Sequence, residues 1–509
     1  MITKTFSATL DGIQGALVQI EAVSLHSIPQ IQITGLPGEV VKESRERVRA
    51  CLVYLGFDVP TEKILVHLSP ANIKKMGSHY DLPIALSVLA AEGRLSGNSL
   101  SEYGFIGEVA LDGHLRAVRG ALPLIEVLIK QPHIKKVIIP KDNEAEGALL
   151  ESPKIFVAKT IGEVLESIRN EKILSHCLVP PTIERAVTYK HLDQVMGQNL
   201  AKRALQIAIA GKHHLLFVGP PGVGKSMLSA AASSLLPEMT HEEFIEVLKI
   251  YSASSIELDS LIRTRTRPYR SPHHSISANG LLGGGSGMLA PGEVSLSHHG
   301  VLFLDEFPEY RRDAIEGLRE PLQSGVLHLT RVGKFLSLPA RFTLIAAMNP
   351  CPCGLFSQTE NRCRCTPEKK AQYRKKLSTP ILDRMALMVQ LTPTDLGKTY
   401  CEERLTHEVI KESIQKATEI QRKRFDKEEA IKSNGAVEAP QAMEGFYLDS
   451  KTENWMKTQQ QQYRLSFRRV NQVIKVARTI ADLEGDDQIL ISHLNEAWGL
   501  RCFDFYQLH

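Results

Sequence analysis

The stretch 219–226, which reads Gly-Pro-Pro-Gly-Val-Gly-Lys-Ser, constrains this chain more than any other. The apolar run 214–218 before it predicts a short buried strand, and the Ala- and Leu-rich run 227–236 after it predicts a helix. Strand, Gly-rich turn, Lys-Ser and helix are the context of a phosphate-binding loop, because backbone N–H groups and the helix N-terminus can then surround a polyphosphate. We expect ATP to lie on Gly219, Pro220, Pro221, Gly222, Val223, Gly224, Lys225 and Ser226. In this loop Lys225 reaches the β- and γ-phosphates and Ser226 holds Mg²⁺.

A second motif supports the nucleotide reading. Residues 301–304 are apolar and lead directly into Asp305 and Glu306. A buried parallel strand of this kind carries carboxylates to its C-terminal edge, where ligands bind in α/β sheets. Asp305 is predicted to complete the Mg²⁺ shell and Glu306 to polarise the attacking water. A further apolar strand, 342–347, ends near Asn349, which is suited to orienting that water. Together the three elements predict nucleotide hydrolysis.

Length and composition restrict the class of protein. The 509 residues are enough for about three domains, each with its own core. The net charge of +4 is too small to indicate a polyanionic partner by itself, so a nucleic-acid argument must rest on local basic patches. No apolar run approaches a membrane span, and the N-terminus lacks the apolar core of a signal peptide. Eight cysteines do not indicate a disulfide scaffold. We expect a cytoplasmic protein without a membrane partner.

Hydrophobic patterning predicts an α/β chain in three parts. Residues 1–170 form a separate α/β domain, and the Pro-containing tract 171–190 is a linker. Residues 191–395 form the P-loop α/β domain. Residues 396–509 form a helical lid, with helices expected over 402–432, 465–483 and 491–501.

The first domain resembles the Lon-protease-like domain that precedes some AAA+ modules, through residues 35–37, 43–48 and 81–85. Active members of that family use a Ser-Lys dyad. In this chain Asp81 occupies the nucleophile position, and the region expected to supply the lysine, 119–123, has none. An acid cannot replace the hydroxyl nucleophile. The resemblance therefore implies a protease fold without its dyad, kept for assembly or DNA binding, with Ser78 and a neighbouring lysine as the alternative.

Two insertions interrupt the P-loop domain. The Gly- and Pro-rich stretch 267–293 predicts an exposed, mobile loop, in which His273 and His274 are either metal ligands or plain loop residues. Residues 330–335 form a hairpin pattern with Gly at the turn. Arg331 and Lys334 on that hairpin are DNA-binding candidates, because cationic tips bind phosphates, although a solvated turn has the same pattern.

Cysteines and basic residues follow Asn349. Four cysteines fall within fifteen residues and can supply a tetrahedral Zn²⁺ site, with free reduced thiols as the alternative: Cys351, Cys353, Cys363 and Cys365. A basic stretch over 369–376 leads to Arg384. An arginine after such a turn can reach the nucleotide of a neighbouring subunit.

Nearly the whole chain resembles the ComM/YifB family of Mg-chelatase-like AAA+ ATPases. The matching motifs are 219–226, 270–274, 291–293, 301–306, 349–354 and 476–483. The resemblance implies homohexameric rings and ATP-driven DNA branch migration, which extends recombination during natural transformation alongside recombination proteins. It also implies that Arg384 is the trans-acting finger and Arg468 the second sensor. Thr379, Ala386 and Gln472 depart from the family pattern near the finger and in the lid.

Three other functions compete with a DNA motor. The chelatase-type ATPase core also suits a motor that remodels a protein partner for metal insertion. An active ATP-dependent protease is disfavoured by the missing dyad. A plain nucleotide-binding scaffold is disfavoured because Glu306, Asn349 and Arg384 are all present.

Overall fold

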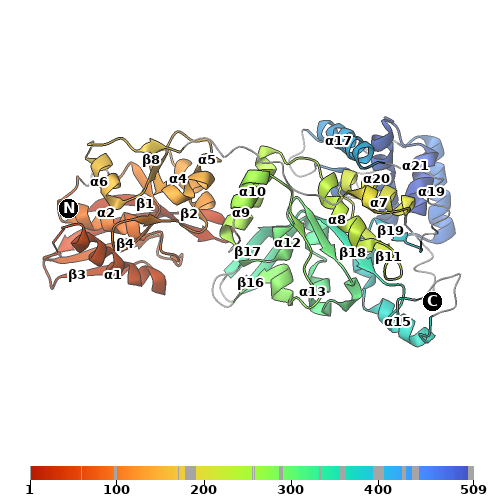
Figure 1. Ribbon diagram of the computed structural model, residues 1–509, viewed down its shortest axis with the longest axis horizontal. Helices are drawn as coiled ribbons and strands as arrows, with labels where there is room; N and C mark the ends of the chain where they lie inside the picture. Colours follow the sequence, from red (N-terminus) through yellow and green to blue (C-terminus); the bar gives the residue numbers. More distant parts are fainter. Residues whose placement is uncertain are drawn as a thin grey trace. The chain divides into compact units, whose positions relative to one another are not determined.

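The structure, a computed structural model, forms two compact units (Figure 1). It describes residues 2–58, 60–96, 100–169, 171–177, 191–254, 256, 258–285, 290–331, 334–355, 363–393, 406–426, 432–437, 446 and 448–501. Unit 1 comprises Met1–Arg185 and His241–Arg265, and unit 2 comprises Ala186–Thr240 and Thr266–His509.

Unit 1 is built on an eight-stranded mixed sheet of order β10-β9-β8-β5-β1-β2-β4-β3. Its centre is the long antiparallel pair β1–β2, and β5 extends the sheet parallel to β1. The strands are β1 (Thr3–Asp11), β2 (Gln14–Leu25), β3 (Gln30–Thr34), β4 (Lys63–Ser69), β5 (Tyr103–Phe105), β8 (Lys136–Pro140), β9 (Ile155–Ala158) and β10 (Ser175–His176). A separate short hairpin joins β6 (Glu108–Val109) and β7 (Leu115–Arg116).

Helices cover both faces of this sheet. Neighbouring residues of a strand point to opposite faces, and on β8 Ile138 belongs to one buried cluster while Val137 and Ile139 belong to another. The first cluster includes residues of α1 (Glu39–Tyr54), α2 (Asp81–Ala91) and α6 (Ile161–Ile168), and the second includes residues of α4 (Ala121–Ile129). The short helix α5 (Glu144–Ala148) follows β8. This architecture confirms the α/β prediction for the N-terminal part.

Two helices of unit 1 come from a distant part of the sequence. Helices α9 (His241–Ala253) and α10 (Asp259–Thr264) lie within the range predicted for the P-loop domain. Lys249 on α9 pairs with Glu126 on α4 at 2.7 Å, and the Ser252 hydroxyl donates to Glu146 at 2.8 Å. Strand β10 likewise lies within the predicted linker. The domain boundaries at 170, 190 and 395 stay predictions.

Unit 2 contains a five-stranded sheet of order β12-β15-β18-β11-β19, in which every neighbouring pair is parallel. The strands are β11 (Leu215–Val218), β12 (Tyr269–Arg270), β15 (Val301–Leu304), β18 (Thr343–Met348) and β19 (Leu387–Gln390). All residues of β11, β15 and β18 are buried, as expected for parallel strands covered on both faces. The carboxyl ends of β15, β18 and β11 therefore meet side by side at one edge.

The helices of this sheet and its insertions follow the order of the chain. They are α7 (Asn199–Gly211), α8 (Lys225–Leu235), α11 (Ala278–Leu282), α12 (Glu293–Leu296), α13 (Arg312–Gly317), α14 (Pro321–Ser324), α15 (Pro367–Lys375) and α16 (Thr379–Leu382). Two antiparallel hairpins accompany them, β13 (Gly283–Gly284) with β14 (Ala290–Pro291), and β16 (Val326–Arg331) with β17 (Lys334–Pro339).

The C-terminal part of unit 2 is helical, as predicted, and shares a core with the sheet. It consists of α17 (His407–Arg424), α19 (Ser450–Tyr463), α20 (Phe467–Glu484) and α21 (Ile491–Gly499). Helix α17 ends at Arg424 and does not continue to Lys432. The fully buried Asp482 of α20 pairs with Arg424 and Arg478, so two residues of the 476–483 motif hold the lid together.

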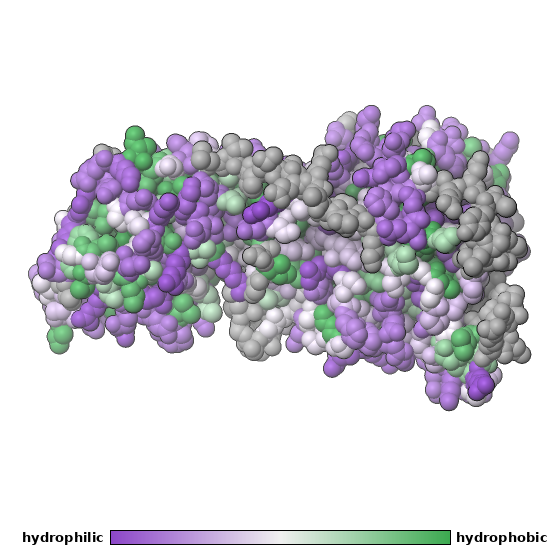
Figure 2. Space-filling view, in the orientation of Figure 1, coloured by the Kyte–Doolittle hydropathy of each residue, from purple (hydrophilic) through white to green (hydrophobic). Residues whose placement is uncertain are grey.

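The face drawn in Figure 2 is largely hydrophilic, with apolar residues in small scattered groups. Among the described residues, no helix is both long enough and apolar enough to cross a membrane.

Candidate phosphate-binding site

The Gly-rich loop lies between β11 and α8, as the sequence predicts. Gly222 and Gly224 have φ angles of 82° and 96°, which favour glycine. A Cβ atom added to Gly222 would meet nothing within 4 Å, so the space beside this residue of the turn is open. The eleven-residue helix α8 begins at Lys225, and its first N–H groups follow the turn directly. A glycine-rich turn with open space beside it and a helix start directly after it is the arrangement of a phosphate cradle.

Lys225 is anchored at the centre of this cradle. Its Nζ donates to the carbonyl oxygens of Gly219 and Pro220 at 2.6 and 2.8 Å, and to Asn349 Oδ1 at 3.1 Å. Burial lowers the pKa of Lys225, while Asp305 and Glu306 oppose that shift. Since Asn349 follows β18, the neighbour of β11, the structure brings two predicted site residues into contact across 124 positions of sequence.

The two acids lie at the carboxyl end of β15. Asp305 Oδ2 accepts a hydrogen bond from Ser226 Oγ at 2.7 Å, so the two predicted Mg²⁺ ligands are in contact. Glu306 has a positive φ of 50°, and its Oε2 lies 3.0 Å from Nδ1 of His274. No sequence pattern predicts this second contact, because His274 belongs to a loop 32 positions away.

These residues fit a Mg²⁺-nucleotide. The loop N–H groups and Lys225 suit phosphate oxygens, and the hydroxyl and carboxylate oxygens of Ser226 and Asp305 are hard ligands of the kind that Mg²⁺ prefers. When bound, the Mg²⁺-nucleotide supplies the phosphoanhydride bond and the charge that polarises it.

The segment 267–293 departs only in part from the prediction of an exposed loop, because Ser271, His273 and Ser275 are exposed whereas the start of the segment is anchored. Arg267 is buried and donates to the carbonyl oxygens of Pro237, Glu238 and His299. Arg270 on β12 forms a two-pronged pair with Glu293 at 2.6 and 2.7 Å. Gly and Pro content alone does not specify these arginine contacts, which join the segment to residues distant in the sequence. Residues 286–289 of this segment lie outside the described residues.

Arg384 follows α16 and is nearly buried. Its guanidinium donates to Pro380 O and to Gln323 Oε1, both at 2.7 Å. Its pKa is lowered mainly by burial, and the positive charges of Arg468 and Arg319 add to the effect. A buried cation among other cations is suited to receive an anion.

Arg468, which the family resemblance predicts to be the second sensor, is exposed near the start of α20. Its neighbour Arg469 instead pairs with Asp383, with two contacts at 2.9 and 3.0 Å. Among the positions that depart from the family pattern, Thr379 begins α16, Ala386 is buried in the core and Gln472 is half-buried in α20.

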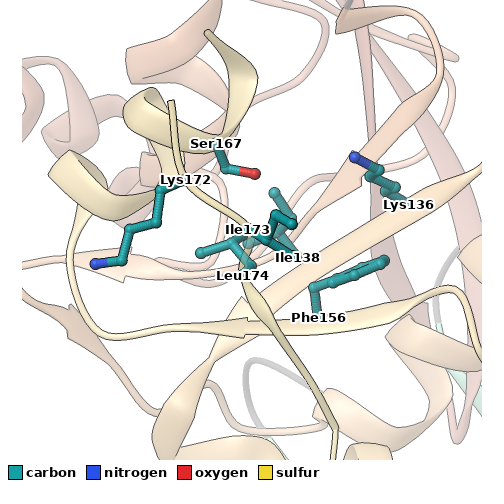
Figure 3. A pocket seen from close by; sticks show the side chains of 7 residues that line it. All are labelled: Lys136, Ile138, Phe156, Ser167, Lys172, Ile173 and Leu174. Carbon is teal, nitrogen blue, oxygen red and sulfur yellow. The ribbon is translucent and has the colours of Figure 1, made fainter. Parts of the chain in front are cut away.

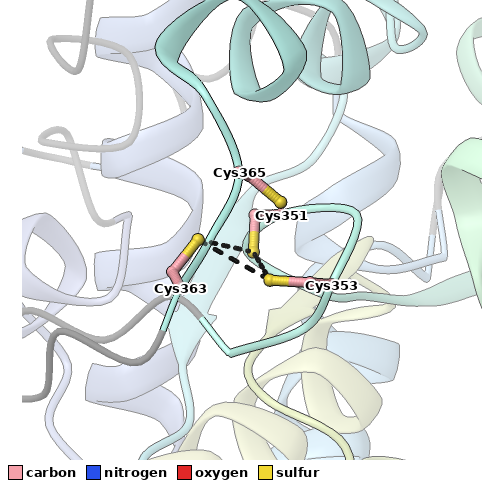
Figure 4. A group of neighbouring side chains, drawn as sticks. All are labelled: Cys351, Cys353, Cys363 and Cys365. Carbon is pink, nitrogen blue, oxygen red and sulfur yellow. Dashed lines mark hydrogen bonds between the residues drawn. The ribbon is translucent and has the colours of Figure 1, made fainter.

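The four cysteines gather at one place, with all Sγ atoms within 4.8 Å of one another (Figure 4). Cys351 Sγ lies 3.4 Å from Cys353 and 3.6 Å from Cys363, and Cys353 lies 3.6 Å from Cys363. These distances exclude disulfides but approach the edges of about 3.8 Å in a tetrahedron with Zn–S bonds of about 2.3 Å. The donor set therefore fits Zn²⁺.

The cysteine loop also touches the phosphate loop. A Cβ atom on Gly354, whose φ is 74°, would lie 2.8 Å from Cδ of Pro221 and 3.8 Å from Cγ of Asn349. A metal that fixes Cys351 and Cys353 would therefore also fix backbone that packs on two predicted nucleotide-site residues.

The predicted basic hairpin exists, with Arg331 paired opposite Lys334 in the register of β16 and β17. Its turn residues, 332 and 333, lie outside the described residues. In the basic stretch over 369–376, Lys369 and Lys375 of the α15 region are exposed, whereas Lys376 pairs with Glu309 at 2.8 Å.

In unit 1, Asp81, which stands at the nucleophile position of the related proteases, is bound by an arginine. Asp81 is fully buried, and its carboxylate accepts hydrogen bonds from Nε and Nη2 of Arg47 at 2.8 and 3.0 Å. The Ser78 hydroxyl donates to Glu108, and the buried Lys75 ammonium donates to the carbonyl oxygen of Pro70. A Ser-Lys dyad needs a hydroxyl directed at the amine, and Ser78 is directed at a carboxylate.

A cavity of about 160 Å³ lies elsewhere in unit 1 (Figure 3). Its lining is Lys136, Ile138, Phe156, Ser167, Lys172, Ile173 and Leu174. The two lysine ammonium groups lie on opposite sides of it, away from its apolar floor.

The parallel sheet, the phosphate loop and the helical C-terminal part define a protein of the AAA+ class. Three family profiles match the chain: "Magnesium chelatase, subunit ChlI" over residues 191–399, "Subunit ChlI of Mg-chelatase" over 20–143, and "Magnesium chelatase, subunit ChlI C-terminal" over 405–501. The first of these matches, over residues 191–399, includes the phosphate-binding site described above.

Relatives that match nearly the full length of the chain indicate the family more narrowly. The chain is 38% identical over 504 residues to the uncharacterized protein YifB of Escherichia coli K12, covering 98% of this chain and 96% of that protein. It is 38% identical over 505 residues to the competence protein ComM of Haemophilus influenzae, covering 98% and 97%. An archaeal Lon protease of Thermococcus kodakarensis is 30% identical over 161 residues, covering 30% of this chain and 25% of that protease. The chain belongs to the ComM/YifB family of magnesium-chelatase-like AAA+ proteins.

Proposed function

We propose that this protein is an ATP-hydrolysing hexameric motor that drives branch migration of DNA in the cytoplasm, extending recombination during natural transformation. The observation that supports hydrolysis best is the paired geometry at one sheet edge. Ser226 contacts Asp305 at 2.7 Å, and Lys225 contacts Asn349 at 3.1 Å. These are the groups that hold Mg²⁺, the phosphates and the attacking water in P-loop enzymes.

The residues have separate roles in this proposal. Lys225 and the loop N–H groups bind the phosphates, and Ser226 with Asp305 holds Mg²⁺. Glu306 accepts the proton of the attacking water, and Asn349 orients that water. Arg384 acts on the nucleotide of the neighbouring subunit, for which its burial among other cations is a supporting feature, and Arg468 acts as a sensor.

DNA is the proposed partner for two reasons. One of the full-length relatives carries the name competence protein, and the hairpin β16–β17 bears Arg331 and Lys334 at its end. Lys369 and Lys375 add exposed positive charge. A motor that moves along DNA needs contacts to phosphates rather than to bases, because base-specific contacts would stall it.

The test is the ATPase rate with and without single-stranded, duplex and four-way junction DNA. We expect DNA to stimulate turnover, junctions to be resolved, and binding to weaken steeply with salt. Arg331→Ala with Lys334→Ala should abolish junction movement but leave basal ATPase near normal. The matched control, Lys451→Ala with Lys457→Ala, removes two exposed lysines of α19 and should change neither activity. Brisk hydrolysis without any DNA binding at low salt would contradict the proposal.

That contrary result would favour the second candidate, a motor that remodels a protein partner for metal insertion. The matches to magnesium chelatase profiles over most of the chain are the observation behind it.

We also propose that Cys351, Cys353, Cys363 and Cys365 bind one structural Zn²⁺. A hydrogen bond from the backbone of Leu355 is the main cause that lowers the pKa of Cys353 to about 6, which favours the thiolate that binds zinc. Elemental analysis of protein purified without chelator should give one zinc per chain. Cys363→Ser with Cys365→Ser should lose it, whereas Cys51→Ser, a buried cysteine of α1, should keep it. A wild-type protein that is folded and active without metal would contradict the zinc proposal and would mean that the four cysteines are free thiols.

A further inference from the structure

The side chain of Glu306 is poorly restrained by its own backbone. Glu306 has a positive φ of 50°, and its side chain is 54% exposed. A carboxylate at such a position can adopt several rotamers, whereas proton acceptance from one water requires a fixed oxygen. The described contact that holds the carboxylate is the one between Oε2 and Nδ1 of His274, at 3.0 Å.

His274 is itself held in place. Strand β12 is paired in parallel with β15, with Tyr269 opposite Val301 and Arg270 opposite Leu302, so the residues that follow the two strands emerge at the same edge. The pair between Arg270 and Glu293 fixes the start of the segment. The hydroxyl of Tyr310 donates to the carbonyl oxygen of Pro272 at 2.6 Å and fixes its middle. The ring of His274 therefore projects from a braced segment.

The energetics favour a role in catalysis over a role in stability. The His274 side chain is 35% exposed and that of Glu306 is 54% exposed. Ion pairs this exposed contribute little to folding stability, because water screens the two charges. In contrast, a reacting group misplaced by about 1 Å can lose about 100-fold in rate.

From this geometry we infer that His274 is a positioning residue for Glu306. Its Nδ1 lies 3.0 Å from Oε2 of the carboxylate, and this contact holds that oxygen in place while the other oxygen serves the attacking water. The inference rests on the proposed ATP hydrolysis, and it gives His274 a role other than metal ligand or plain loop residue.

The adjacent histidine provides a matched control. The rings of His273 and His274 lie 4.1 Å apart, but Nδ1 of His273 contacts Ser275 instead of Glu306. The experiment compares wild type, His274→Ala, His274→Asn and His273→Ala. For each, kcat and KM for ATP, the affinity for a non-hydrolysable ATP analogue and the melting temperature are measured.

We expect His274→Ala to lower kcat at least about 10-fold with little change in KM, analogue affinity or melting temperature. His274→Asn, whose polar amide can contact the carboxylate in place of the imidazole, should recover part of that loss, and His273→Ala should behave like wild type. An unchanged or raised kcat in His274→Ala overturns the inference, as does a loss confined to KM or shared equally by His273→Ala. A wild type that does not hydrolyse ATP instead overturns the proposed function.

Discussion

Asp81 in unit 1 and Asp305 in unit 2 are both acids in α/β units, but their surroundings are opposite. Asp81 begins helix α2, is fully buried and is bound by Arg47 on α1. Asp305 follows a strand at the open edge of a parallel sheet and faces the hydroxyl of Ser226. A carboxylate whose oxygens are occupied by an internal arginine holds elements together. A carboxylate at a strand end beside a phosphate loop remains available to a ligand.

The pKa values follow the same contrast. Burial raises the pKa of Asp81, and hydrogen bonds from Arg47 and Ser44 oppose the rise. The hydrogen bond with Asp81 in turn raises the pKa of Arg47. The two upward pKa shifts have different causes. Burial penalises the charged form of Asp81, while the ion pair favours the charged form of Arg47. Asp81 in unit 1 is thus part of a structural pair. Substitutions at Asp81 should change stability, whereas substitutions in the phosphate-binding site of unit 2 should change ATP turnover.

The largest effect is expected at Lys225. Lys225→Ala removes the positive charge from the phosphate cradle, so ATP binding should weaken and hydrolysis should fall by about 100-fold or more. Turnover assays and nucleotide titrations measure both losses. Lys457→Ala, at an exposed position of α19, is the control and should retain both. ATP binding at the wild-type level in Lys225→Ala would contradict the assignment of phosphate binding to Lys225 in unit 2.

Arg384 should show a large effect that crosses subunits. Arg384→Ala is expected to lose about 100-fold or more in turnover, since arginine fingers stabilise transition-state charge. Mixed with Lys225→Ala protein, it should regain part of the activity, because some interfaces then combine an intact arginine with an intact loop. Demonstrably mixed rings without rescue would mean that Arg384 acts within its own subunit.

Asp81 should matter to stability and not to turnover. Asp81→Leu leaves Arg47 without its buried partner and should cost about 3 kcal/mol, the low end for broken buried pairs, because the Arg47 side chain is 25% exposed and can turn to water. Urea unfolding measures this loss. The double variant Asp81→Leu with Arg47→Met should recover much of it. Intact stability with lost ATPase would reverse the roles assigned to the two acids.

A smaller effect is expected from the buried histidine next to Asp81. Burial lowers the pKa of His79 to about 4, against the hydrogen bond to Ala8 that raises it. The unfolded chain binds the proton near pH 6.5 and the folded chain only near pH 4, so stability is full above pH 6.5 and is lost as pH falls. Each such proton gives a slope of about 1.4 kcal/mol per pH unit. His79→Gln should flatten the stability of unit 1 between pH 6.5 and 4.5, as followed by hydrogen exchange. An unchanged slope would show that other groups set the acid sensitivity.

The same two sites show what could be predicted from sequence. The phosphate loop, the strand ending in Asp305 and Glu306, and the strand leading to Asn349 are local patterns, and each element was predicted close to its position. The contacts of Glu306 with His274 and of Arg270 with Glu293 join segments 23 to 32 residues apart, and no local pattern specifies such a pairing. The placement of α9 in unit 1 depends on matches such as Lys249 with Glu126, which only the folded chain brings together.

The most direct measurement is the fate of labelled ATP during a single turnover. Glu306→Gln preserves the shape of the side chain and the Mg²⁺ ligands Ser226 and Asp305, so this variant should bind ATP and keep it unhydrolysed. Asp81→Asn, which removes a buried charge from unit 1, should convert ATP to ADP at the wild-type rate in the fraction that folds. Hydrolysis at the wild-type rate by Glu306→Gln, or loss of hydrolysis in folded Asp81→Asn, would contradict the assignment of chemistry to unit 2 and of structural pairing to unit 1.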